Sequence, residues 1–452
     1  YAVQFDSYTG PSGSSSLSRS AGMFANFNYS WDNRYLIDLT GRIDGSSNFA
    51  SKQRSAPFWS AGVRWNIYNE KFMKTHGWFE NLAVRANIGT VGNQNFQLSQ
   101  IMTLYNFLKM YDGVMGAEIM SIANPELKWQ TTLNRNIGLE FSLLQGLVNL
   151  DFNYYSNITK NNLTDIAILP STGFSTYKAN MGKVRNQGYE FSLSITPIKK
   201  NGWIVNAFVN GAHNKNKLLN ISDALRDYNE VIKENQTAHL NYAGYTQLER
   251  IFLFEEGQSL NSIFAVRSMG IDPGTGQEIF VTADGVQTFQ WNAADQVVVG
   301  NTEPTLKGYF GLNVDYKRWS FGANFQYSFG ADRYNKTLYE KIEGGNFAQN
   351  ADRRALTQRW TKPGDVAKYR GYGNTSQLKP TSRFVQKDDF LSMTSARLSY
   401  TLNANDLQAL GISLLKFTLS TNDLFYVSTI KQERGLSYPF ARTFYFSLQA
   451  NF

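Results

Sequence analysis

The residue types best suited to catalysis or metal binding are few in this sequence and lie far apart. Its three histidines, His76, His213 and His239, stand in separate turn or loop contexts. A metal or catalytic cluster needs at least two such side chains at a matched spacing. The absence of cysteine excludes disulfides, thiolate metal sites and a cysteine nucleophile. We therefore expect structural or solvated histidines, no metal site and no cofactor.

Known catalytic and phosphate-binding patterns are also missing. The chain has no GxSxG nucleophile elbow, no GxxxxGK[ST] phosphate loop and no HExxH sequence. Asp272 and Glu278, in the stretch DPGTGQE, could together hold a cation, but a turn built from Pro and Gly is the favoured interpretation. We predict that the protein is not an enzyme.

Binding chemistry is expected instead from aromatic side chains in the long segments between strands. Aromatic rings stack on sugars or pack against peptide side chains, and a nearby guanidinium adds hydrogen bonds. Packing within the loop or against a partner protein is the alternative role for each residue. The candidate substrate-binding residues are Tyr105, Tyr111, Phe174, Tyr177, Trp291, Tyr369, Tyr372 and Arg383.

The elements that would position these loops are strands with strict two-residue alternation. In the segment 319–330 every second residue from Trp319 to Phe329 is apolar, five of these six are aromatic, and the residues between them are polar or glycine. This segment is about twice the length of a typical soluble strand of about five or six residues. The same pattern predicts thirteen strands, at 23–31, 35–42, 59–66, 82–89, 136–143, 148–155, 188–196, 203–211, 309–316, 319–330, 396–401, 415–422 and 443–452.

The composition favours a membrane location for these strands. Of the 452 residues 15% are aromatic and only 18% are charged, and the mean hydropathy is −0.37. No run approaches the roughly 18 apolar residues of a membrane helix, so a membrane protein of this composition has to be a closed barrel. The net charge of +8 is scattered, which does not favour nucleic-acid binding. We predict an all-β fold, a transmembrane antiparallel β-barrel.

The polar faces of the predicted strands carry charges of both signs. On the lipid face an Arg or Lys would cost roughly 2–4 kcal/mol at the bilayer midplane, so these charges are expected to face a hydrated or plug-filled lumen. Solvated faces of soluble β-sandwiches are the alternative interpretation. The residues are Asp38, Glu140, Asp151, Glu190, Asp315, Arg42, Arg64, Arg85, Arg397 and Lys416.

The connections between strands come in two sizes, as expected for short periplasmic turns and long extracellular loops. If the Asp32-Asn33 turn is periplasmic, the first strand runs inward, and a chain that also ends inward has an odd number of strands. An even-stranded barrel cannot be closed by an odd number, so further strands are expected outside this sequence. The stretch from Ser262 to Val281 is the one place where the count is open. The missing signal peptide also indicates the C-terminal portion of a longer protein.

Several longer stretches resemble one family. They are RYLIDLTGRIDGSSNFA (34–50), RANIGTVGNQN (85–95), NPELKWQTT (124–132), GKVRNQGYEFSL (182–193), EEGQSLNSIFAVRSMGIDPGTG (255–276), FQYSFG (325–330), NDLF (422–425) and YPFARTFYFSLQANF (438–452). Together and in this order, they resemble the C-terminal half of SusC-like (RagA-like) TonB-dependent outer-membrane transporters.

The resemblance implies an architecture and a location. In that family a 22-stranded barrel holds an N-terminal plug, a SusD-like lipoprotein closes the extracellular face, and TonB pulls on a segment ahead of the plug. Residues 1–452 would then supply about 13 of the 22 strands, and the plug and first strands would lie outside this chain. The expected location is the outer membrane of a Bacteroidetes-type Gram-negative cell, in contact with outer-membrane lipid, in a dimer of SusC–SusD pairs.

The resemblance also implies a function, the import of oligosaccharides. A peptide importer of the RagA type, or a structural or secretion-associated barrel without import activity, are the alternatives; the odd strand count opposes a complete passive pore. The final stretch TFYFSLQANF ends on Phe452, which we expect to act as a membrane assembly signal.

Overall fold

A computed structural model describes most of the chain. The described residues are 17–47, 54–73, 78–93, 103–111, 114–121, 124, 127–167, 176–180, 182–234, 253–345, 352–372, 378–403, 407, 411–431 and 441–452.

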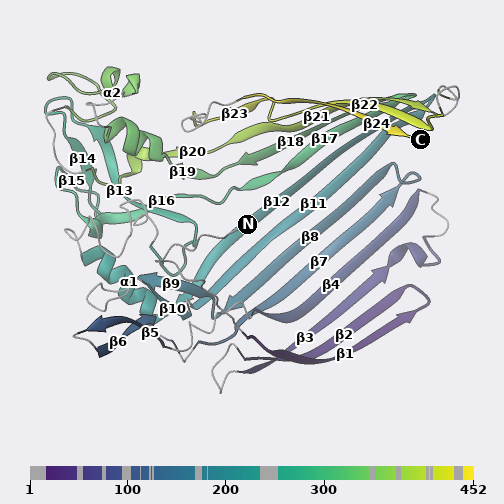
Figure 1. Cartoon of the computed structure of the whole chain (residues 1–452), viewed down its shortest axis with the longest axis horizontal. Coiled ribbons are helices and arrows are strands. Elements are labelled where there is room, and N and C mark those ends of the chain that lie inside the picture. The colour runs from purple at the N-terminus through teal and green to yellow at the C-terminus, as the bar shows by residue number, and fades with distance from the viewer. Residues whose placement is uncertain are drawn as a thin grey trace, which may run out of the picture.

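One large antiparallel sheet makes up the body of the molecule (Figure 1). Each strand pairs with the next one along the path, and the short strand β23 (Tyr426–Ser428) pairs with β21 beside it. All thirteen predicted strands lie on this path, which confirms the predicted antiparallel barrel wall. The path is β1 (Ser20–Trp31), β2 (Tyr35–Ser46), β3 (Ser55–Asn66), β4 (Phe79–Asn93), β7 (Gln130–Leu143), β8 (Val148–Lys160), β11 (Gly182–Lys200), β12 (Trp203–Ile221), β17 (Leu306–Tyr316), β18 (Trp319–Phe329), β21 (Phe390–Asn403), β22 (Leu414–Asn422) and β24 (Phe444–Asn451).

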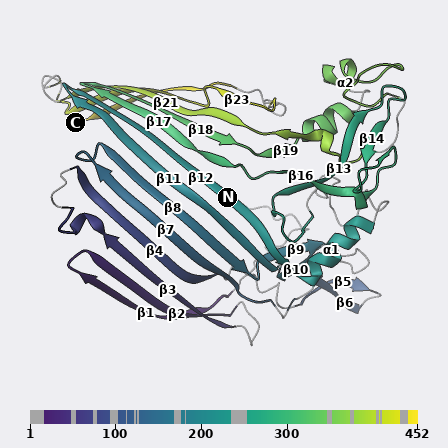
Figure 2. The same cartoon turned by 180° about the vertical axis from the view of Figure 1, so that it is seen from behind.

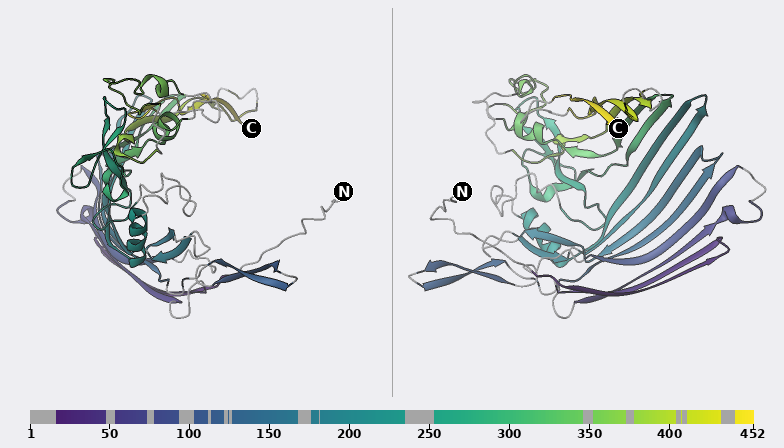
Figure 3. Two further views of the ribbon diagram at one scale, coloured as in Figure 1. Left: turned by 90° about the vertical axis from the view of Figure 1, so that its left-hand side faces the viewer. Right: turned by 45° about the vertical axis from the view of Figure 1, so that its right-hand side comes forward.

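The sheet curves into an arc with a concave and a convex side (Figure 3). The helix α1 (Asp223–Glu234) lies on the concave side, where its Leu225 packs against Val184 of β11 and Leu218 of β12. Because side chains alternate along a strand, the even-numbered residues of β11 and β12 face the concave side and the odd-numbered ones the convex side. The polar faces therefore line the inside of the arc.

The convex side is apolar and open. Many of its large side chains are exposed, among them Met23 at 80% and Phe446 at 69%. A continuous apolar face of this extent needs a partner other than water, and lipid supplies it for a barrel wall. Among the described residues no helix is long and apolar enough to cross a membrane.

Rings gather where the strands meet the short turns. Trp203 stacks on Tyr316 with ring centroids 4.1 Å apart, and Trp319 lies 4.7 Å from Tyr400. At the same end, near the β1 edge of the sheet, Tyr35 of β2 stacks on Trp65 of β3 with ring centroids 6.3 Å apart. Such rings mark the membrane–water interface, where a flat amphipathic side chain is stable.

The first short turn joins the paired residues Trp31 and Tyr35 through three residues, two of which have a left-handed backbone. Asp32 and Asn33 adopt φ angles of 53° and 52°, and Arg34 N donates to Trp31 O at 2.9 Å. Two positive φ angles in succession match a type I′ turn, which Asp and Asn tolerate better than most residues. The predicted hairpin of 23–31 and 35–42 is confirmed.

The long connections fold into small elements at the opposite end of the sheet (Figure 2). They are the hairpins β5 (Leu104–Tyr111) with β6 (Val114–Ser121) and β9 (Leu163–Ala167) with β10 (Thr176–Asn180), the sheet of β15 (Gln287–Thr288), β14 (Glu278–Val281), β13 (Ser262–Ile271) and β16 (Gln296–Asn301), the pair β19 (Asp332–Tyr334) and β20 (Val385–Lys387), and the helices η7 (Thr337–Glu343), α2 (Arg353–Thr357) and η8 (Ser382–Phe384). We call the part formed by the described residues of 262–301 and 332–387 the dome.

The dome settles the open strand count. The stretch from Ser262 to Val281 forms β13 and β14, which belong to the dome and add no strand to the large sheet. The dome also has a hydrophobic core of its own, in which Tyr339 meets Phe384 edge-on with ring centroids 5.3 Å apart. The large sheet is thus a wall between two environments, and the dome a packed body at one end of it.

Candidate functional site

A chain of ion pairs crosses four neighbouring strands on the concave face. Arg64 of β3 lies 2.7 Å from Glu140 of β7, and Arg85 of β4 pairs with the same carboxylate. Arg85 also reaches Asp151 of β8 at 3.1 Å. The four side chains were predicted from sequence to share the lumenal face, and the structure connects them to one another.

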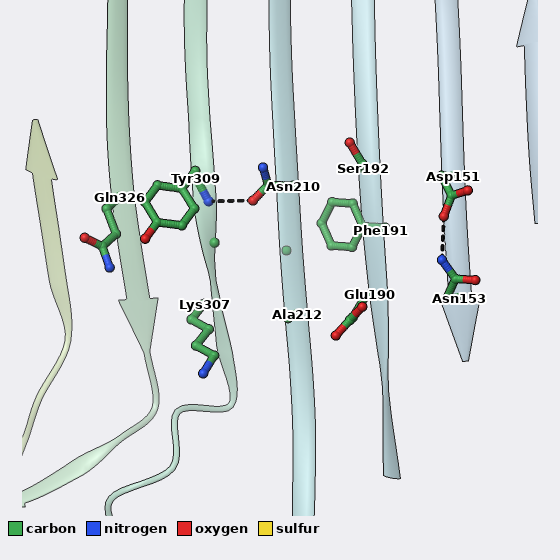
Figure 4. Close-up of a pocket in the computed structure, with 12 residues that line it drawn as sticks. Asp151, Asn153, Glu190, Phe191, Ser192, Asn210, Ala212, Lys307, Tyr309 and Gln326 are labelled. Atoms are coloured by element: carbon green, nitrogen blue, oxygen red, sulfur yellow. Dashed lines mark hydrogen bonds between the residues drawn. The ribbon is translucent and has the colours of Figure 1, made fainter. Parts of the chain in front are cut away.

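Beside this chain of ion pairs the concave face is hollowed over β8, β11, β12, β17 and β18 (Figure 4). The hollow has a volume of about 500 Å³. Its lining mixes carboxylates, amides, one amine and one phenol ring, and it includes Asp151, Asn153, Glu190, Asn210, Lys307 and Tyr309. Donors, acceptors and a ring on one wall suit a ligand rich in hydroxyl or amide groups.

Hydrogen bonds fix part of this lining. The side-chain oxygen of Asn210 accepts from Tyr309 N at 3.0 Å, and Asn153 donates to Asp151 at 2.5 Å (Figure 4). Tyr309 keeps 46% of its surface exposed. Tyr309 occupies a polar-face position of β17, so its ring faces the lumen rather than lipid.

Behind the hollow, two facing glycines leave the convex side of the sheet without a side chain of their own. Gly211 of β12 lies opposite Gly308 of β17, and the ring of Tyr327 covers both from the convex side. A Cβ added at Gly308 would meet Asn210 O at 2.0 Å, and one at Gly211 would meet the Phe191 ring at 2.6 Å. Tyr327 donates its hydroxyl proton to Asn210 O at 2.9 Å. The backbone that carries Asn210 is therefore held from the opposite face of the sheet.

The dome contains a second polar centre, built around Arg383 of η8. Its guanidinium lies 2.9 Å from Glu278 of β14 and 2.9 Å from Glu343 of η7, and it also donates to Lys368 O at 2.7 Å. The side chains of Arg383, Glu278 and Glu343 are 13%, 5% and 0% exposed. Arg370 adds a second guanidinium to Glu343 at 2.8 Å.

Electrostatics keep this centre charged. Burial alone would raise the pKa of Glu343, but the guanidiniums of Arg383 and Arg370 outweigh burial and hold the pKa below its usual value. Burial would lower the pKa of Arg383, and the two carboxylates raise it instead. The centre thus acts as an ionic clamp that ties β14, η7 and η8 together.

The structure brings four of the predicted binding residues into the dome. The guanidinium of Arg383 is bound to Glu278 and Glu343 in the clamp. Tyr369 is buried, with 5% of its surface exposed. Trp291 donates its indole proton to Pro380 O at 3.2 Å and carries Lys379 over its ring. Tyr372 is 46% exposed and faces the guanidinium of Arg359 at 5.3 Å.

The remaining predicted residues lie elsewhere. Tyr105 is exposed on the β5–β6 hairpin, away from the dome (Figure 1). Tyr111 and Tyr177 belong to β5 and β10, and their side chains lie outside the described part. Phe174, like His76 and His239, lies outside the described residues. Substrate binding stays a prediction for all eight residues.

Asp151 and Glu190 of this lining were predicted to face the lumen, but no residue of the hollow was predicted to bind substrate, although Tyr309 gave a signal. Tyr309 stands at a position of the alternating pattern that is otherwise polar, so its ring could have been assigned to the lumen. The stretch DPGTGQE forms a turn, as favoured: Asp272 accepts from Thr275 N at 3.0 Å, while Glu278 pairs with Arg383. In the part of the chain that the structure describes, no three His, Asp or Glu side chains are grouped to hold a metal ion.

These features define a class of protein. A meander of long strands with an apolar convex face, rings at the short-turn end and a charged concave face is the wall of an outer-membrane β-barrel. The family model described as TonB dependent receptor-like, beta-barrel matches residues 2–248, so the chain belongs to this family.

Relatives and a solved structure agree with this assignment. The chain is 28% identical over 442 residues to TonB-dependent receptor P39 of Formosa agariphila, covering 89% of this chain and 42% of that protein. It is 27% identical over 348 residues to TonB-dependent receptor SusC of Bacteroides thetaiotaomicron, covering 73% and 33%. The structure of the RagAB peptide transporter matches with a TM-score of 0.78 and 25% identity, covering 91% of this chain and 44% of that one.

The comparisons confirm the resemblance to SusC-like (RagA-like) receptors and the location in the outer membrane of Bacteroidetes. The chain spans about two fifths of the length of TonB-dependent receptor P39 and a third of SusC. The members of this family are transporters rather than enzymes.

Proposed function

We propose that this chain is the wall of an energy-coupled importer of the outer membrane, of the SusC type. The observation that carries the proposal is the hydrophilic concave face, with its ion pairs and its hollow of about 500 Å³, behind an apolar convex face. A wall of this kind encloses a hydrated path through lipid. A structural barrel without import activity would not need exposed polar and aromatic groups of the kind that bind ligands on its concave face.

The cargo we propose first is an oligosaccharide. Amide side chains such as Asn153 and Asn210 and the exposed ring of Tyr309 suit hydroxyl groups and the flat faces of sugar rings. A peptide is the second candidate, and the likeness to the RagAB peptide transporter favours it. Carboxylates and Lys307 in the same lining could also pair with the charged ends and side chains of a peptide.

We propose a SusD-like lipoprotein as the partner over the dome. The dome exposes large apolar side chains, which fit a protein contact: Val366 at 95%, Met269 at 64%, Leu356 at 54% and Phe289 at 52%. Tyr105, Trp291 and Tyr372 would contact cargo or this partner, and Arg383 would position the dome. TonB would act through a segment outside this chain, and pairs of barrel and lipoprotein would form dimers.

The proposed domain organisation follows from the sheet edges. Among the described residues β1 pairs only with β2 and β24 only with β22, so each edge strand has one side without a hydrogen-bonded neighbour. In a bilayer such edges have to be closed. We propose that residues 1–452 form one partial barrel domain and that a plug and about nine further strands, outside this sequence, complete 22.

The test is energy-dependent uptake by cells that carry the full-length receptor. Tyr309→Ala should reduce uptake of the native cargo several-fold without changing receptor abundance, and Tyr154→Ala, on the convex face, should not. Mass spectrometry of material co-purified with the full-length receptor should identify a SusD-like lipoprotein and separate glycan from peptide cargo. Uptake of neither class, with a receptor that reaches the outer membrane, would favour the structural barrel.

A further inference from the structure

The convex face has a regular row structure across β7, β8, β11 and β12. The register joins Ile137 to Tyr154, Tyr154 to Tyr189, and Tyr189 to His213. Tyr189 and His213 lie with ring centroids 5.1 Å apart, and Tyr189 also stacks with Phe152, one row away, at 6.3 Å. This row is the aromatic edge of the apolar face at the dome end.

The spacing to the other aromatic edge matches a bilayer. On β12, His213 lies ten residues from Trp203, which stacks on Tyr316 at the short-turn end. Ten residues at about 3.4 Å, tilted by about 40°, span about 26 Å across the membrane. An outer-membrane barrel has an apolar band about 25 Å tall. His213 and Tyr189 therefore mark the boundary with the extracellular head groups.

The rows directly beyond this boundary carry only positive charge. They contain six cationic side chains on the convex side, while the other convex positions of these rows are Thr, Leu, Ser, Ile and Gln. No ion pair joins any of the six to a carboxylate within the described residues. We call them the outer basic patch: Arg135, Lys160, Lys183, Arg185, Lys215 and Lys217.

Four of these cations face each other in two pairs, and in the first Lys183 of β11 is the register partner of Lys160 of β8. In the second, Arg185 of β11 is the register partner of Lys217 of β12, and Lys215 lies one row closer to the membrane. Like charges at opposed positions destabilise an antiparallel pair unless an anion joins them. The Nε of Arg185 is also buried without a hydrogen-bond partner.

A cavity opens beside Arg185 and Lys217. It has a volume of about 560 Å³, and Arg185, Lys215 and Lys217 line it together with His213. Two carboxylates share its lining, but both are engaged. Glu303 accepts hydrogen bonds from Asn214 and from Asn216 N, and Asp332 pairs with Lys387 at 2.7 Å.

We propose that the outer basic patch binds the phosphate groups of lipids in the extracellular leaflet of the outer membrane. On β12, Lys215 and Lys217 stand two and four residues beyond His213, about 5 and 10 Å above the apolar band at the same tilt. That is the depth of the head groups. An anionic head group would neutralise the opposed Arg185–Lys217 pair, while the acyl chains lie on the apolar face below. This role does not depend on what the receptor imports.

The experiment uses the full-length receptor in nanodiscs of phosphatidylcholine doped with either lipid A that carries its phosphates or dephosphorylated lipid A. Native mass spectrometry would count lipid A molecules retained on the released protein. The wild type should retain the phosphorylated form, and the triple variant Arg185→Gln, Lys215→Gln, Lys217→Gln should retain at least about ten-fold less, because each cation near an anionic surface contributes to binding.

The matched control removes three exposed cations at the short-turn end, Lys199→Gln, Lys200→Gln and Lys317→Gln, and should retain lipid A as the wild type does. The charge-preserving pair Arg185→Lys, Lys217→Arg should retain it too, and heat-modifiable migration on gels verifies that each variant is folded. Excess free inorganic phosphate should not displace the lipid. Equal retention by wild type and triple variant, equal retention of both lipid A forms, or binding of free phosphate alone would overturn the proposal. The proposal would also be overturned if the triple variant lost a bound protein while its lipid A retention stayed unchanged, because the patch would then bind a protein.

Discussion

The carboxylate of Glu343 and the guanidinium of Arg383 lie 2.9 Å apart at the centre of the dome, with their side chains 0% and 13% exposed. Glu343 belongs to η7 and Arg383 to η8, 40 residues later. The pair therefore joins two segments that are distant in sequence, beside the contact of Tyr339 of η7 with Phe384 of η8. Removing one partner leaves a buried charge without compensation, which is costly in a protein interior.

Arg383→Ala is expected to destabilise the dome by about 3–5 kcal/mol, the range measured when one partner of a buried ion pair is removed. The dome should become sensitive to limited proteolysis while the barrel wall keeps its heat-modifiable migration. Arg226→Ala, at an exposed ion pair on α1, is the control and should change stability by no more than about 1 kcal/mol. An equally resistant dome in the Arg383 variant would contradict the clamp.

The dome should lose stability in acid. The pKa of Glu343 is lower in the folded protein than its ordinary value of 4.5. A depressed folded pKa contributes stability that is present above the unfolded value and is lost as the pH falls through the folded value. Protease resistance of the dome should thus be similar at pH 7 and pH 5.5 and should fall below about pH 4.5. In the variant Glu343→Gln this pH dependence should be weaker.

The ion pairs of the concave face should matter little for stability. Arg64, Glu140 and Arg85 are each about one fifth to one third exposed, so water screens them. Glu140→Gln is expected to cost no more than about 1 kcal/mol and to leave assembly intact. Thermal conversion of the folded gel band would measure this cost. A variant that no longer inserts would show that the pairs are needed for assembly.

Gly308→Ala should weaken the wall behind the hollow. The added Cβ would meet Asn210 O at 2.0 Å, a contact that the strands relieve only by moving apart. Such overpacking typically costs about 1–3 kcal/mol. Gly41→Ala in β2 is the matched control, since nothing lies within 4 Å of its added Cβ. The temperature at which the folded band disappears should fall for Gly308→Ala and stay unchanged for Gly41→Ala.

Phe452→Ser tests the predicted assembly signal. Phe452 is 91% exposed, so the substitution removes almost no packing within the chain. If the residue is an assembly signal, the amount of folded receptor in the outer membrane should fall several-fold while its melting behaviour stays the same. Phe446→Ser, on the same face of β24, is the comparison, and its effect should appear in stability. Normal amounts of the Phe452 variant would leave the last residue without this role.

The barrel wall was predictable because its physics is local. Each strand repeats one rule, apolar toward lipid and polar toward the lumen, so the segment 319–330 could be assigned from its own residues alone. The turn at Asp32-Asn33 was also predictable, because two residues that tolerate positive φ stand between two segments of alternating apolar and polar residues.

The dome was not predictable, because its partners are distant in sequence. Arg383 looked like a free donor for a ligand, yet its carboxylate partner Glu278 lies 105 residues away. No periodic pattern connects such positions. The hollow was not predicted for a different reason: aromatic binding residues are expected in loops, while Tyr309 belongs to the strand β17.

The charges that cross β3, β4, β7 and β8 have a consequence for anything that moves along the lumen. Arg64 and Arg85 carry two positive charges and Glu140 and Asp151 two negative ones, so the group as a whole is neutral. The potential of a neutral alternating group fades faster with distance than that of a single charge, and salt reduces it further beyond about 8–10 Å. This part of the lumenal surface is therefore hydrated but has only a weak electrostatic potential beyond contact distance. An oligomer that moves past it would be attracted only on direct contact and would dissociate readily.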